Sequence, residues 1–486
     1  MLNFTIQELV DATGATLLCG NGDQPVHAVT IDSRQVKSGS CFCAFAGERQ
    51  DGNDFVMAAA QAGAACCVMS REPSHQELAC AIKNHCALVR ALDDDAQEFL
   101  LLLADAWRAR NPHWKVLAVT GSVGKTTTKD MCYAACKAQV KTCATQGNYN
   151  NLIGMPLTLL SADSQDEVVV LEMGMNHLDE ISRMSRIARP QVAIITNVGT
   201  AHIGLLGSQD NIARAKAEVL DGMKPTDVDP GSRLIMPAED MYSLIIQAAY
   251  AMLKHVETCR VGFLGPMSVC PEDNAVNGYD MELDAEGCAR FVLRYHDGET
   301  FQMHLSIPGR GSAVDCLLAL GALDHLGMDR AASVEAIAAL KPGRMRAEVK
   351  SAPGRPCVID DTYNASPTSM ASALDLLSTM DCKGRRIAVL GEMGEMGEKA
   401  PYLHSLVGAY AAAKPLDILC VIGGELAQDI LTGARMVGLT EDEIIYVKDV
   451  DSALRVLAPV LTEDDCVLVK ASRSAQLDRF VEGVLE

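Results

Sequence analysis

The stretch LAVTGSVGKTTTKDM, at residues 117–131, is the most informative part of this sequence. A buried strand is predicted to end at Thr120, a glycine-rich turn follows, and a helix begins after Lys125. Backbone amides at a helix N-terminus bind anions, so residues 121–126 are expected to hold the β- and γ-phosphates of a nucleotide. Lys125 would then reach the transferred phosphate, and the Thr126 hydroxyl would ligate magnesium.

The glycine spacing departs from the strict pattern G-x-x-x-x-G-K-[ST], whose first glycine would fall at Val119. An ordinary strand–turn–helix with incidental glycines is the alternative interpretation. The Lys-Thr-Thr run directly after a glycine, between a strand and a helix, favours the phosphate loop. The loop residues predicted to contact ATP are Gly121, Ser122, Val123, Gly124, Lys125, Thr126 and Thr127.

Two further predicted strands end in polar side chains. The segment VVVLEMGMNH (168–177) places Glu172 at the end of a buried strand, and IITNVGTAHIGLLGS (194–208) places Asn197 and His202 after the next. Ligands bind at the carboxyl edge of open α/β sheets, so Glu172 is a candidate metal carboxylate beside the loop. Surface carboxylates are common and a lone histidine is more often structural. Glu172 and His202 are therefore candidates for the site only because the phosphate loop is expected beside them.

The fold class expected is α/β in three domains, because 486 residues exceed one ordinary domain. Residues 1–92 read as a small mixed α/β domain. Residues 93–342 alternate buried strands and helices, which indicates a central parallel sheet of the P-loop ATPase type. Residues 343–486 read as a C-terminal Rossmann-like domain.

Composition excludes several classes of protein. The net charge of −21 makes a general nucleic-acid binder improbable on physical grounds, because phosphate contacts need clustered Lys and Arg. Hydrophobic residues make up 49%, too many for a disordered chain, and aromatics only 4%, so the cores are expected to consist of Ala, Leu, Val, Ile and Met. No signal peptide or membrane span is predicted, and the 18 cysteines form no C-x-x-C pair. We therefore expect a cytoplasmic protein with reduced thiols.

A run of motifs resembles the ATP-dependent Mur ligases of peptidoglycan synthesis, over essentially the whole chain. The motifs are IDSR (31–34), DGNDF (51–55), TGSVGKTTTK (120–129), GNYNNLIGMPLTLL (147–160), EMGMNHLDEI (172–181), TNVGTAHIGLLGS (196–208), IARAKAEVL (212–220), DDTYNASPTSM (360–370), LGEMGEMGE (390–398) and VKASRS (469–474). Two of them, DTYNASP and LGEMGEMGE, are similar to the member that adds a D-alanyl-D-alanine dipeptide.

The resemblance implies a reaction and its cofactors, ATP and Mg²⁺. ATP phosphorylates the terminal carboxylate of UDP-MurNAc-tripeptide, and the amine of D-Ala-D-Ala attacks the acyl phosphate to give UDP-MurNAc-pentapeptide. Thr126 and Glu172 look like ligands of one magnesium, and His202 resembles the residue beside a second. Lys216 matches a lysine that the family carbamylates; an exposed helical lysine is the alternative. Asn148, Asn150 and Asn151 could serve the peptide end and the phosphates, although such clusters are otherwise mostly turns.

The resemblance also implies roles outside the central domain. Arg344 would reach the phosphates when the third domain closes, and Asp361 would accept hydrogen bonds from the ATP ribose. The residues expected to bind D-Ala-D-Ala are Tyr363, Asn364, Ser366, Ser472 and Arg473, with Lys470 nearby. Those expected to contact the UDP-substrate are Ser33, Arg34, Gly47, Asp51 and Gly52. A basic C-terminal turn is the alternative for Arg473, and a surface salt bridge is the alternative for Arg34. A monomer is implied.

Several positions depart from the family. At 309–316 the chain reads GRGSAVDC where G-x-H-N-x-x-N-A is usual, so Asp315 stands where an asparagine touches adenine. An ionised Asp accepts but cannot donate, which predicts a divergent nucleotide pocket. Asn53 replaces a histidine, Gly204 an acidic residue, and Ala471 a glycine; PAED stands at 237–240 for Asn-Asp-Asp. The alternatives are a sister ligase that adds another amino acid and a non-catalytic nucleotide-binding relative.

Overall fold

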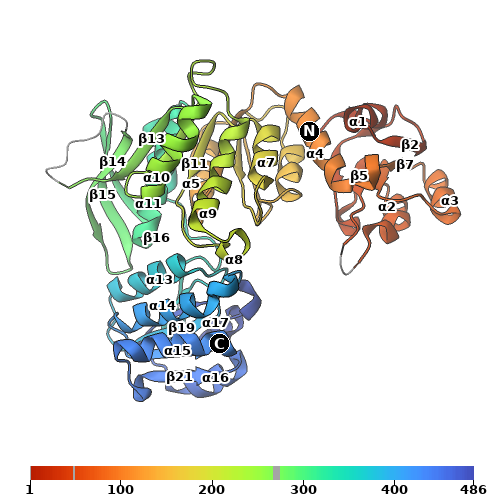
Figure 1. Cartoon of the computed structure of the whole chain (residues 1–486). Helices are drawn as coiled ribbons and strands as arrows, with labels where there is room; N and C mark the ends of the chain where they lie inside the picture. The colour runs from red at the N-terminus through yellow and green to blue at the C-terminus, as the bar shows by residue number, and fades with distance from the viewer. Residues whose placement is uncertain (1, 48–49, 266–273) are drawn as a thin grey trace.

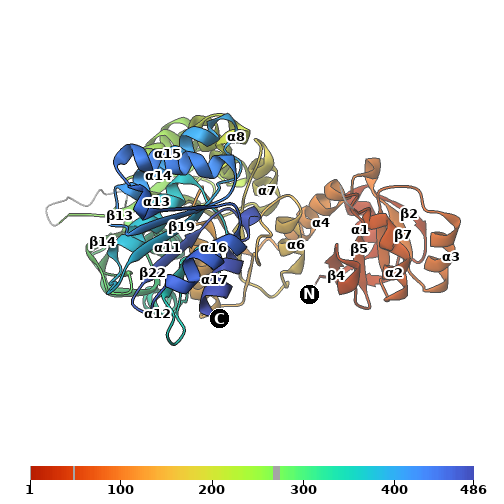
Figure 2. The same ribbon diagram turned by 90° about the horizontal axis from the view of Figure 1, so that it is seen from below.

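The computed structural model describes residues 2–47, 50–265 and 274–486, arranged as three α/β units (Figure 1). Each unit is built on its own sheet, of five, nine and six strands, and a short two-stranded ribbon joins β1 (Phe4–Thr5) to β3 (Pro25–Val26). The N-terminal unit lies to one side of the central unit and the C-terminal unit lies below it, so the two outer units are well apart (Figure 1, Figure 2).

The N-terminal sheet has the strand order β2-β7-β6-β5-β4. Its strands are β2 (Thr16–Cys19), β4 (Ala28–Thr30), β5 (Ser40–Cys43), β6 (Cys66–Met69) and β7 (Ala87–Arg90), and its helices are α1 (Ile6–Thr13), α2 (Val56–Gln61) and α3 (His75–Lys83). Cys41 and Cys43 lie buried on β5. The cysteines among the described residues are all free.

Helix α4 (Ala96–Arg110) connects the N-terminal unit to the central one. It packs on α1 on one side and on helices of the central unit on the other. The only two tryptophans of the sequence lie at this junction, with their ring centroids 6.2 Å apart. Trp107 also packs against Phe4 and donates a hydrogen bond from Nε1 to the carbonyl of Ala162, at 3.2 Å. The junction is therefore an aromatic contact in a chain otherwise poor in aromatic residues.

The central sheet has the order β16-β15-β14-β13-β12-β11-β8-β10-β9. Its strands are β8 (Lys115–Thr120), β9 (Thr142–Ala144), β10 (Val168–Glu172), β11 (Val192–Ile195), β12 (Arg233–Pro237), β13 (Thr258–Phe263), β14 (Asn274–Leu283), β15 (Cys288–Tyr295) and β16 (Thr300–Pro308). Its helices are α5 (Lys125–Lys137), α6 (Gly154–Ser161), α7 (Glu180–Ala188), α8 (Ile203–Leu206), α9 (Gln209–Ala217), α10 (Met241–Ile246), α11 (Arg310–His325) and α12 (Arg330–Ala338).

The strands from β9 to β14 are parallel, as the continuous apolar runs predicted. Strands β15 and β16 extend the sheet in antiparallel fashion, which the sequence analysis did not anticipate. Along β15 buried residues alternate with more exposed ones, a pattern typical of a strand with one face in water. The parallel strands carry most of the candidate site, and the end of β16, at Ile307 and Pro308, also lines it.

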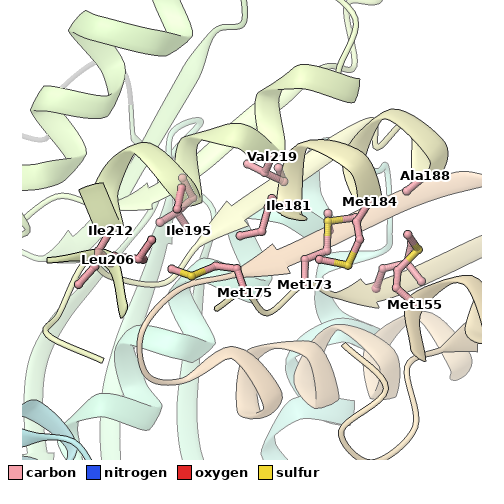
Figure 3. Close-up of a cluster of buried hydrophobic side chains, with 14 of the residues drawn as sticks. Met155, Met173, Met175, Ile181, Met184, Ala188, Ile195, Leu206, Ile212 and Val219 are labelled. Atoms are coloured by element: carbon pink, nitrogen blue, oxygen red, sulfur yellow. The ribbon is translucent and has the colours of Figure 1, made fainter. Parts of the chain in front are cut away.

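Both faces of the parallel sheet are covered. Alternate residues of β8 serve the two cores: Val116 and Ala118 face one, and Leu117 and Val119 the other. Figure 3 shows part of the first core, where four methionines lie among aliphatic side chains beneath α7 and α9; the labelled residues are Met155, Met173, Met175, Ile181, Met184, Ala188, Ile195, Leu206, Ile212 and Val219. The core consists mainly of Ala, Leu, Val, Ile and Met, as the composition predicted.

The C-terminal sheet has the order β17-β18-β22-β19-β20-β21 and is parallel except for β17. Its strands are β17 (Glu348–Lys350), β18 (Cys357–Asp360), β19 (Arg386–Gly391), β20 (Ile418–Ile422), β21 (Ile444–Val447) and β22 (Cys466–Lys470). Its helices are α13 (Pro367–Thr379), α14 (Ala400–Ala412), α15 (Glu425–Val437), α16 (Val450–Leu457) and α17 (Asp478–Leu485). Across the described ranges, no helix combines the length and apolar character needed to cross a bilayer.

Candidate active site

A cavity of about 700 Å³ lies between the central and C-terminal units. The phosphate loop, the start of α11 and the segment after β10 line it from one side; residues 346–379, Glu395 and Lys470 line it from the other. A cavity of this size suits a nucleotide with part of a second substrate. The structure thus brings together predicted residues from the central and C-terminal units.

The loop between β8 and α5 is held in a fixed shape by its neighbours. Gly121 has φ +147°, and a Cβ there would lie 1.8 Å from the Thr196 hydroxyl oxygen, so only glycine fits. The Asn197 side chain accepts a hydrogen bond from the Val123 amide at 3.0 Å and donates one to its carbonyl at 2.9 Å. Asn197, which the sequence placed at this sheet edge, therefore fastens the loop.

Lys125 begins α5 with its ammonium at the mouth of the loop. Its Nζ donates to the carbonyls of Gly121, at 2.8 Å, and Ser122, at 3.3 Å. Burial lowers the pKa of Lys125; the Glu172 carboxylate opposes this shift and Arg346 adds to it. A cation in such a desolvated position interacts strongly with an incoming phosphate.

Thr126 and Glu172 form a pair of oxygen ligands beside the loop. The Thr126 hydroxyl donates to Glu172 Oε2 at 2.8 Å, and Asn150 Nδ2 donates to Oε1 at 2.8 Å. Glu172 is buried at the end of β10, where it was predicted. Hydroxyl and carboxylate oxygens are ligands that Mg²⁺ prefers, so these two side chains fit a magnesium site. In the described chain no three His, Cys, Asp or Glu side chains are arranged to hold a metal, so phosphate and water would complete the coordination.

The C-terminal unit contributes a polar wall to the cavity. Asp361 follows β18, and Lys470 Nζ contacts its Oδ2 at 2.5 Å and the carbonyl of Asn364 at 2.9 Å. Tyr363, Asn364 and Ser366 all line the cavity. Ser366 also caps α13, because its Oγ accepts from the Ser369 amide. The buried Lys470 therefore fixes the loop that carries the predicted ribose and dipeptide residues.

Family models match three consecutive parts of this chain. The model described as Mur ligase family, catalytic domain, matches residues 25–103; the Mur ligase middle domain matches 119–323; and the Mur ligase, glutamate ligase domain, matches 343–473. The chain belongs to the Mur ligase family.

Individual Mur ligases match over their full length. The UDP-N-acetylmuramoyl-tripeptide–D-alanyl-D-alanine ligase of Bacillus subtilis is 31% identical over 100% of this chain and 99% of its own, and that of Escherichia coli is 30% identical over the same shares. The crystal structure of MurF from Acinetobacter baumannii superposes with a TM-score of 0.85 at 28% identity and covers 99% of both chains. MurF from Thermotoga maritima, in complex with ADP, gives 0.77 at 26% identity over 94% of this chain and 97% of its own.

Two asparagines predicted beside the Mur ligase phosphate loop differ in their surroundings. Asn150 contacts Glu172 directly. Asn151 lines the cavity, but its Oδ1 accepts hydrogen bonds from the amides of Ile153 and Gly154, at 3.1 and 2.8 Å, so it shapes the turn before α6. Asn148 also lines the cavity. Asn151 is therefore a turn residue, as the alternative interpretation had it. A direct contact of Asn151 with the peptide end or the phosphates stays a prediction.

Lys216 lies on α9, behind the lining of the cavity. Its side chain is buried, and neither a hydrogen bond nor an ion pair to it is found within the described ranges. Burial lowers the pKa of Lys216 well below its ordinary value, and the nearby Lys125 adds to the shift. The alternative of an exposed helical lysine is therefore wrong. A buried, readily deprotonated amine fits the predicted carbamylation.

Only part of the predicted arginine set reaches the cavity. Arg344 is exposed and outside the lining, whereas Arg346 lines it and stacks over the Tyr363 ring at 4.1 Å from Arg Cζ. Arg473 forms an ion pair with Asp478 at 2.8 Å, and Ser472 accepts a hydrogen bond from the Gly394 amide. Neither Ser472 nor Arg473 lines the cavity. Arg346 was not predicted, although it lies only two residues after Arg344 in the segment KPGRMR (341–346).

The predicted UDP-substrate residues form a separate group in the N-terminal unit. Ser33 and Arg34 form a short turn after β4, and the Arg34 guanidinium pairs with Asp32 at 2.8 Å on the surface. Asp51 accepts from the amide and side chain of Asn53, and Gly52 approaches the Phe45 backbone too closely for a Cβ. Gly47 lies beside them, hydrogen-bonded to Gln50. None of the five lines the shared cavity.

A tight contact joins the central and C-terminal units next to His202. His202 Nδ1 lies 2.6 Å from Glu395 Oε2, and both residues have positive φ. The Gly204 amide donates to the Glu395 carbonyl at 3.0 Å, and a Cβ on Gly204 would lie 2.3 Å from the Gly397 nitrogen. We call this contact, residues 202–207 against 395–399, the seam. The close approach of the two backbones at the seam explains why this chain has glycine at position 204, where Mur ligases frequently have an acidic residue.

Asp315 lies in the first turns of α11, pressed against the phosphate loop. A Cβ on Gly124 would lie 2.3 Å from its Oδ1, and only 8% of the residue is exposed. Burial raises the pKa of Asp315 to about 8. A carboxyl group that stays protonated at neutral pH both donates and accepts, as an asparagine amide does. At neutral pH, Asp315 in place of the usual asparagine therefore alters the hydrogen bonding of the nucleotide pocket less than the sequence predicted.

Proposed function

We propose that this chain is an ATP-dependent ligase that adds D-Ala-D-Ala to UDP-MurNAc-tripeptide and produces UDP-MurNAc-pentapeptide for peptidoglycan synthesis. One observation carries the proposal: the phosphate loop, the Thr126–Glu172 pair and the DTYNAS loop line one cavity between two units. Relatives that bear this activity in their names match the chain from end to end. The first half-reaction would be phosphoryl transfer from ATP to the tripeptide carboxylate.

The residues of the loop suit phosphoryl transfer to a carboxylate. Two anions must approach one another, so Lys125 and the amides of the loop would offset their repulsion. Magnesium, held by Thr126 and Glu172, would neutralise charge on the transferring phosphate. Asn150 keeps the Glu172 carboxylate oriented through its 2.8 Å hydrogen bond. The same proposal includes a second magnesium ion, which His202 and Lys216, once carbamylated, would help to hold.

The second half-reaction would use the C-terminal wall of the cavity. The amine of D-Ala-D-Ala would attack the carbonyl carbon of the acyl phosphate, lose a proton and displace inorganic phosphate, while ADP remains from the first half-reaction. Tyr363, Asn364 and Ser366 would surround the dipeptide, and Asp361 would lie at the ribose. Arg346 lies in the cavity wall, close enough to help lower the pKa of Lys125. It is therefore a better candidate than Arg344 for binding the phosphates. Ser472 and Arg473 would join the site only after the Arg473–Asp478 pair separates.

We further propose that the boundaries at 92/93 and 342/343 separate three domains that move during catalysis. The UDP-substrate group around Arg34 and Asp51 lies outside the shared cavity, so the N-terminal domain would swing toward it when UDP-MurNAc-tripeptide binds. Small-angle scattering with nucleotide and UDP-substrate together should show a smaller radius of gyration. An unchanged radius would refute this movement.

Phosphate release tests the function directly. Purified protein should release phosphate only when ATP, magnesium, UDP-MurNAc-tripeptide and D-Ala-D-Ala are all present. Equal release without D-Ala-D-Ala, or none at all, would contradict the proposal and favour a non-catalytic relative. Release with a single amino acid in place of the dipeptide would favour a sister ligase. Tripeptides ending in Lys or diaminopimelate, assayed in parallel, would identify the third residue.

A further inference from the structure

Three cysteines lie together at the amino ends of two neighbouring strands of the C-terminal unit. Cys357 begins β18 and Cys466 begins β22, and the two residues are direct partners in the register of this parallel pair. Cys382 lies in the loop after α13 and packs against the same core as the other two. Asp361 and Lys470 lie at the opposite ends of these strands, and none of the three cysteines lines the cavity.

Hydrogen bonds from two of these thiols connect the loop after α13 with the start of β22. Cys466 Sγ donates to the carbonyl of Asp381 at 3.6 Å. Cys382 Sγ donates to the carbonyls of Arg385, at 3.3 Å, and Asp464, at 3.7 Å. Each thiol thus reaches the segment that carries the other, so the cysteines of the loop and of β22 lie side by side.

The three thiols differ in accessibility and acidity. Cys466 is only 4% exposed, whereas Cys357 and Cys382 are half-buried. Hydrogen bonding with the Cys466 thiol lowers the pKa of Cys357, against the effect of burial, and the same contact raises the pKa of Cys466. Burial raises the pKa of Cys382. Reactive cysteines are accessible and form the thiolate readily, so Cys357 is the expected nucleophile of the three.

A pair of thiols in the N-terminal unit lacks these properties although its sulfur atoms are close. The sulfur atoms of Cys67 and Cys86 lie 3.7 Å apart, but both residues are buried. Hydrogen bonding with Cys86, together with burial, raises the pKa of Cys67 well above its ordinary value. Proximity alone therefore does not make a thiol pair reactive, and the C-terminal cysteines combine proximity with access.

We propose that Cys357 and Cys466 form a redox site, which a small hydroperoxide converts to a disulfide. Partner residues on neighbouring strands have Cα atoms about 4.8 Å apart, and disulfides join Cα atoms about 4.4–6.8 Å apart. Both side chains leave the sheet on the same face, where they contact the same core. The bond can therefore form while the two strands stay paired.

The reaction has two steps and consumes one hydroperoxide. The Cys357 thiolate attacks an oxygen of the hydroperoxide, so an S–O bond forms, the O–O bond breaks, and the alkoxide takes up a proton and leaves as an alcohol. The Cys466 sulfur then attacks the sulfenic acid, so an S–S bond forms, the S–O bond breaks, and hydroxide leaves with the Cys466 proton as water. Two thiols lose two electrons, which reduce the hydroperoxide to the alcohol and water.

The disulfide loosens a contact between the central and C-terminal units. Residues 284–287, the turn between β14 and β15, form what we call the hairpin tip. The Ala285 carbonyl accepts a hydrogen bond from the Asp381 amide at 3.0 Å, and a Cβ on Gly287 would lie 2.5 Å from a side chain of α13. A disulfide sulfur has no proton to donate, so the Asp381 carbonyl loses its bond from Cys466. Oxidation therefore weakens the support of the residue that holds the hairpin tip.

Peptide mapping by mass spectrometry tests the site. Wild-type protein treated with hydrogen peroxide, alkylated and digested without reductant should yield two peptides linked through Cys357 and Cys466, and dithiothreitol should separate them. Cys357→Ser should abolish the link. Cys466→Ser should stop the reaction at the Cys357 sulfenic acid, which dimedone traps. Cys143→Ser, at a half-buried cysteine whose pKa burial raises, is the matched control and should leave the linked peptides unchanged.

Hydrogen exchange, read by mass spectrometry, tests the effect on the contact. In oxidised wild-type protein the peptides that contain Asp381 and the hairpin tip should exchange severalfold faster than in reduced protein. The peptide that contains residues 395–399 of the seam should exchange at the same rate in both. Cys357→Ser treated with peroxide should match the reduced wild type. Neither mapping nor exchange uses ligase activity, so both results are independent of the proposed function.

Three outcomes would overturn the inference. The first is oxidised wild-type protein without linked peptides, and the second is a link that joins Cys67 to Cys86 or includes Cys382. The third is unchanged exchange at Asp381 in protein that carries the Cys357–Cys466 bond. All three compare oxidised with reduced wild-type protein, so they do not depend on whether a serine variant folds.

Discussion

The phosphate loop and the seam are both parts of one cavity wall, yet they are built in opposite ways. The loop is held within the central unit, by Asn197 on Val123 and by Thr196 against Gly121. The seam exists only where two units meet, through the His202–Glu395 pair and the approach of Gly204 to Gly397. The expected phosphate contacts therefore lie within one unit, whereas the complete cavity depends on the position of another.

Removing the ammonium of the loop should have the largest effect. Lys125→Ala should lower turnover by about 10³-fold, because the phosphate loses its buried cationic partner while the seam stays intact. Phosphate-release kinetics measure the loss, and binding of UDP-MurNAc-tripeptide should persist. Lys137→Ala, at the exposed end of the same helix, is the control. Retained activity in Lys125→Ala would contradict the role assigned to the loop.

Forcing the seam apart should have the next largest effect. In Gly204→Val the added side chain would collide with the backbone of residues 396–397, so the C-terminal unit should be displaced and turnover reduced by about 100-fold. The nucleotide should still bind, since the loop does not depend on the seam. Calorimetry of ATP binding, alongside the turnover assay, checks both statements. Gly424→Ala, where a Cβ meets only the Glu392 carboxylate at 3.5 Å, should behave as wild type.

ATP affinity should vary with pH because Asp315 lies beside the phosphate loop. With a pKa of about 8, Asp315 is protonated at neutral pH and ionises above that value. A carboxylate beside the phosphates repels them, so ATP affinity should be constant below pH 8 and fall by up to about tenfold for each pH unit above it. Calorimetric titrations between pH 6 and 10 measure this. Asp315→Asn should remove the dependence, and a parallel decline in that variant would refute the explanation.

The same group should affect stability. Its folded-state pKa is raised from 3.8, so the protein is destabilised progressively as the pH rises between about 4 and 8. Asp315→Asn should therefore raise the melting temperature more at pH 8 than at pH 5. An equal gain in melting temperature at both pH values would mean that ionisation of Asp315 does not affect the stability of the protein.

Loss of charge at the seam should have the smallest effect. Glu395→Gln keeps the shape of the side chain and the backbone contact with Gly204, so turnover should fall only about threefold. Steady-state kinetics should assign the loss to kcat rather than to the KM for ATP. A loss as large as that of Gly204→Val would show that the contact between the His202 and Glu395 side chains, and not the backbone approach, holds the two units together.

The sequence predicted the features that lie within short segments. The loop, Glu172 at the end of its strand and the parallel strands follow from local patterns of glycine, charge and apolar runs. Arg346 and Glu395 were missed because their roles depend on docking of the C-terminal unit. Gly204 looked like an unexplained departure, since its reason lies 193 positions away at Gly397. The position of the N-terminal unit could not be predicted, because no local pattern encodes the angle at a linker helix.

The tryptophan pair at the α4 junction gives the protein a built-in optical probe. Both indoles of the chain are buried where the N-terminal unit meets the central one, in contact with each other, and Trp107 also packs against Phe4. Excitation that selects indole therefore reports on this one place, without a label. Swinging of the N-terminal unit on UDP-substrate binding should alter the emission maximum or intensity, so stopped-flow fluorescence can time that step separately from chemistry.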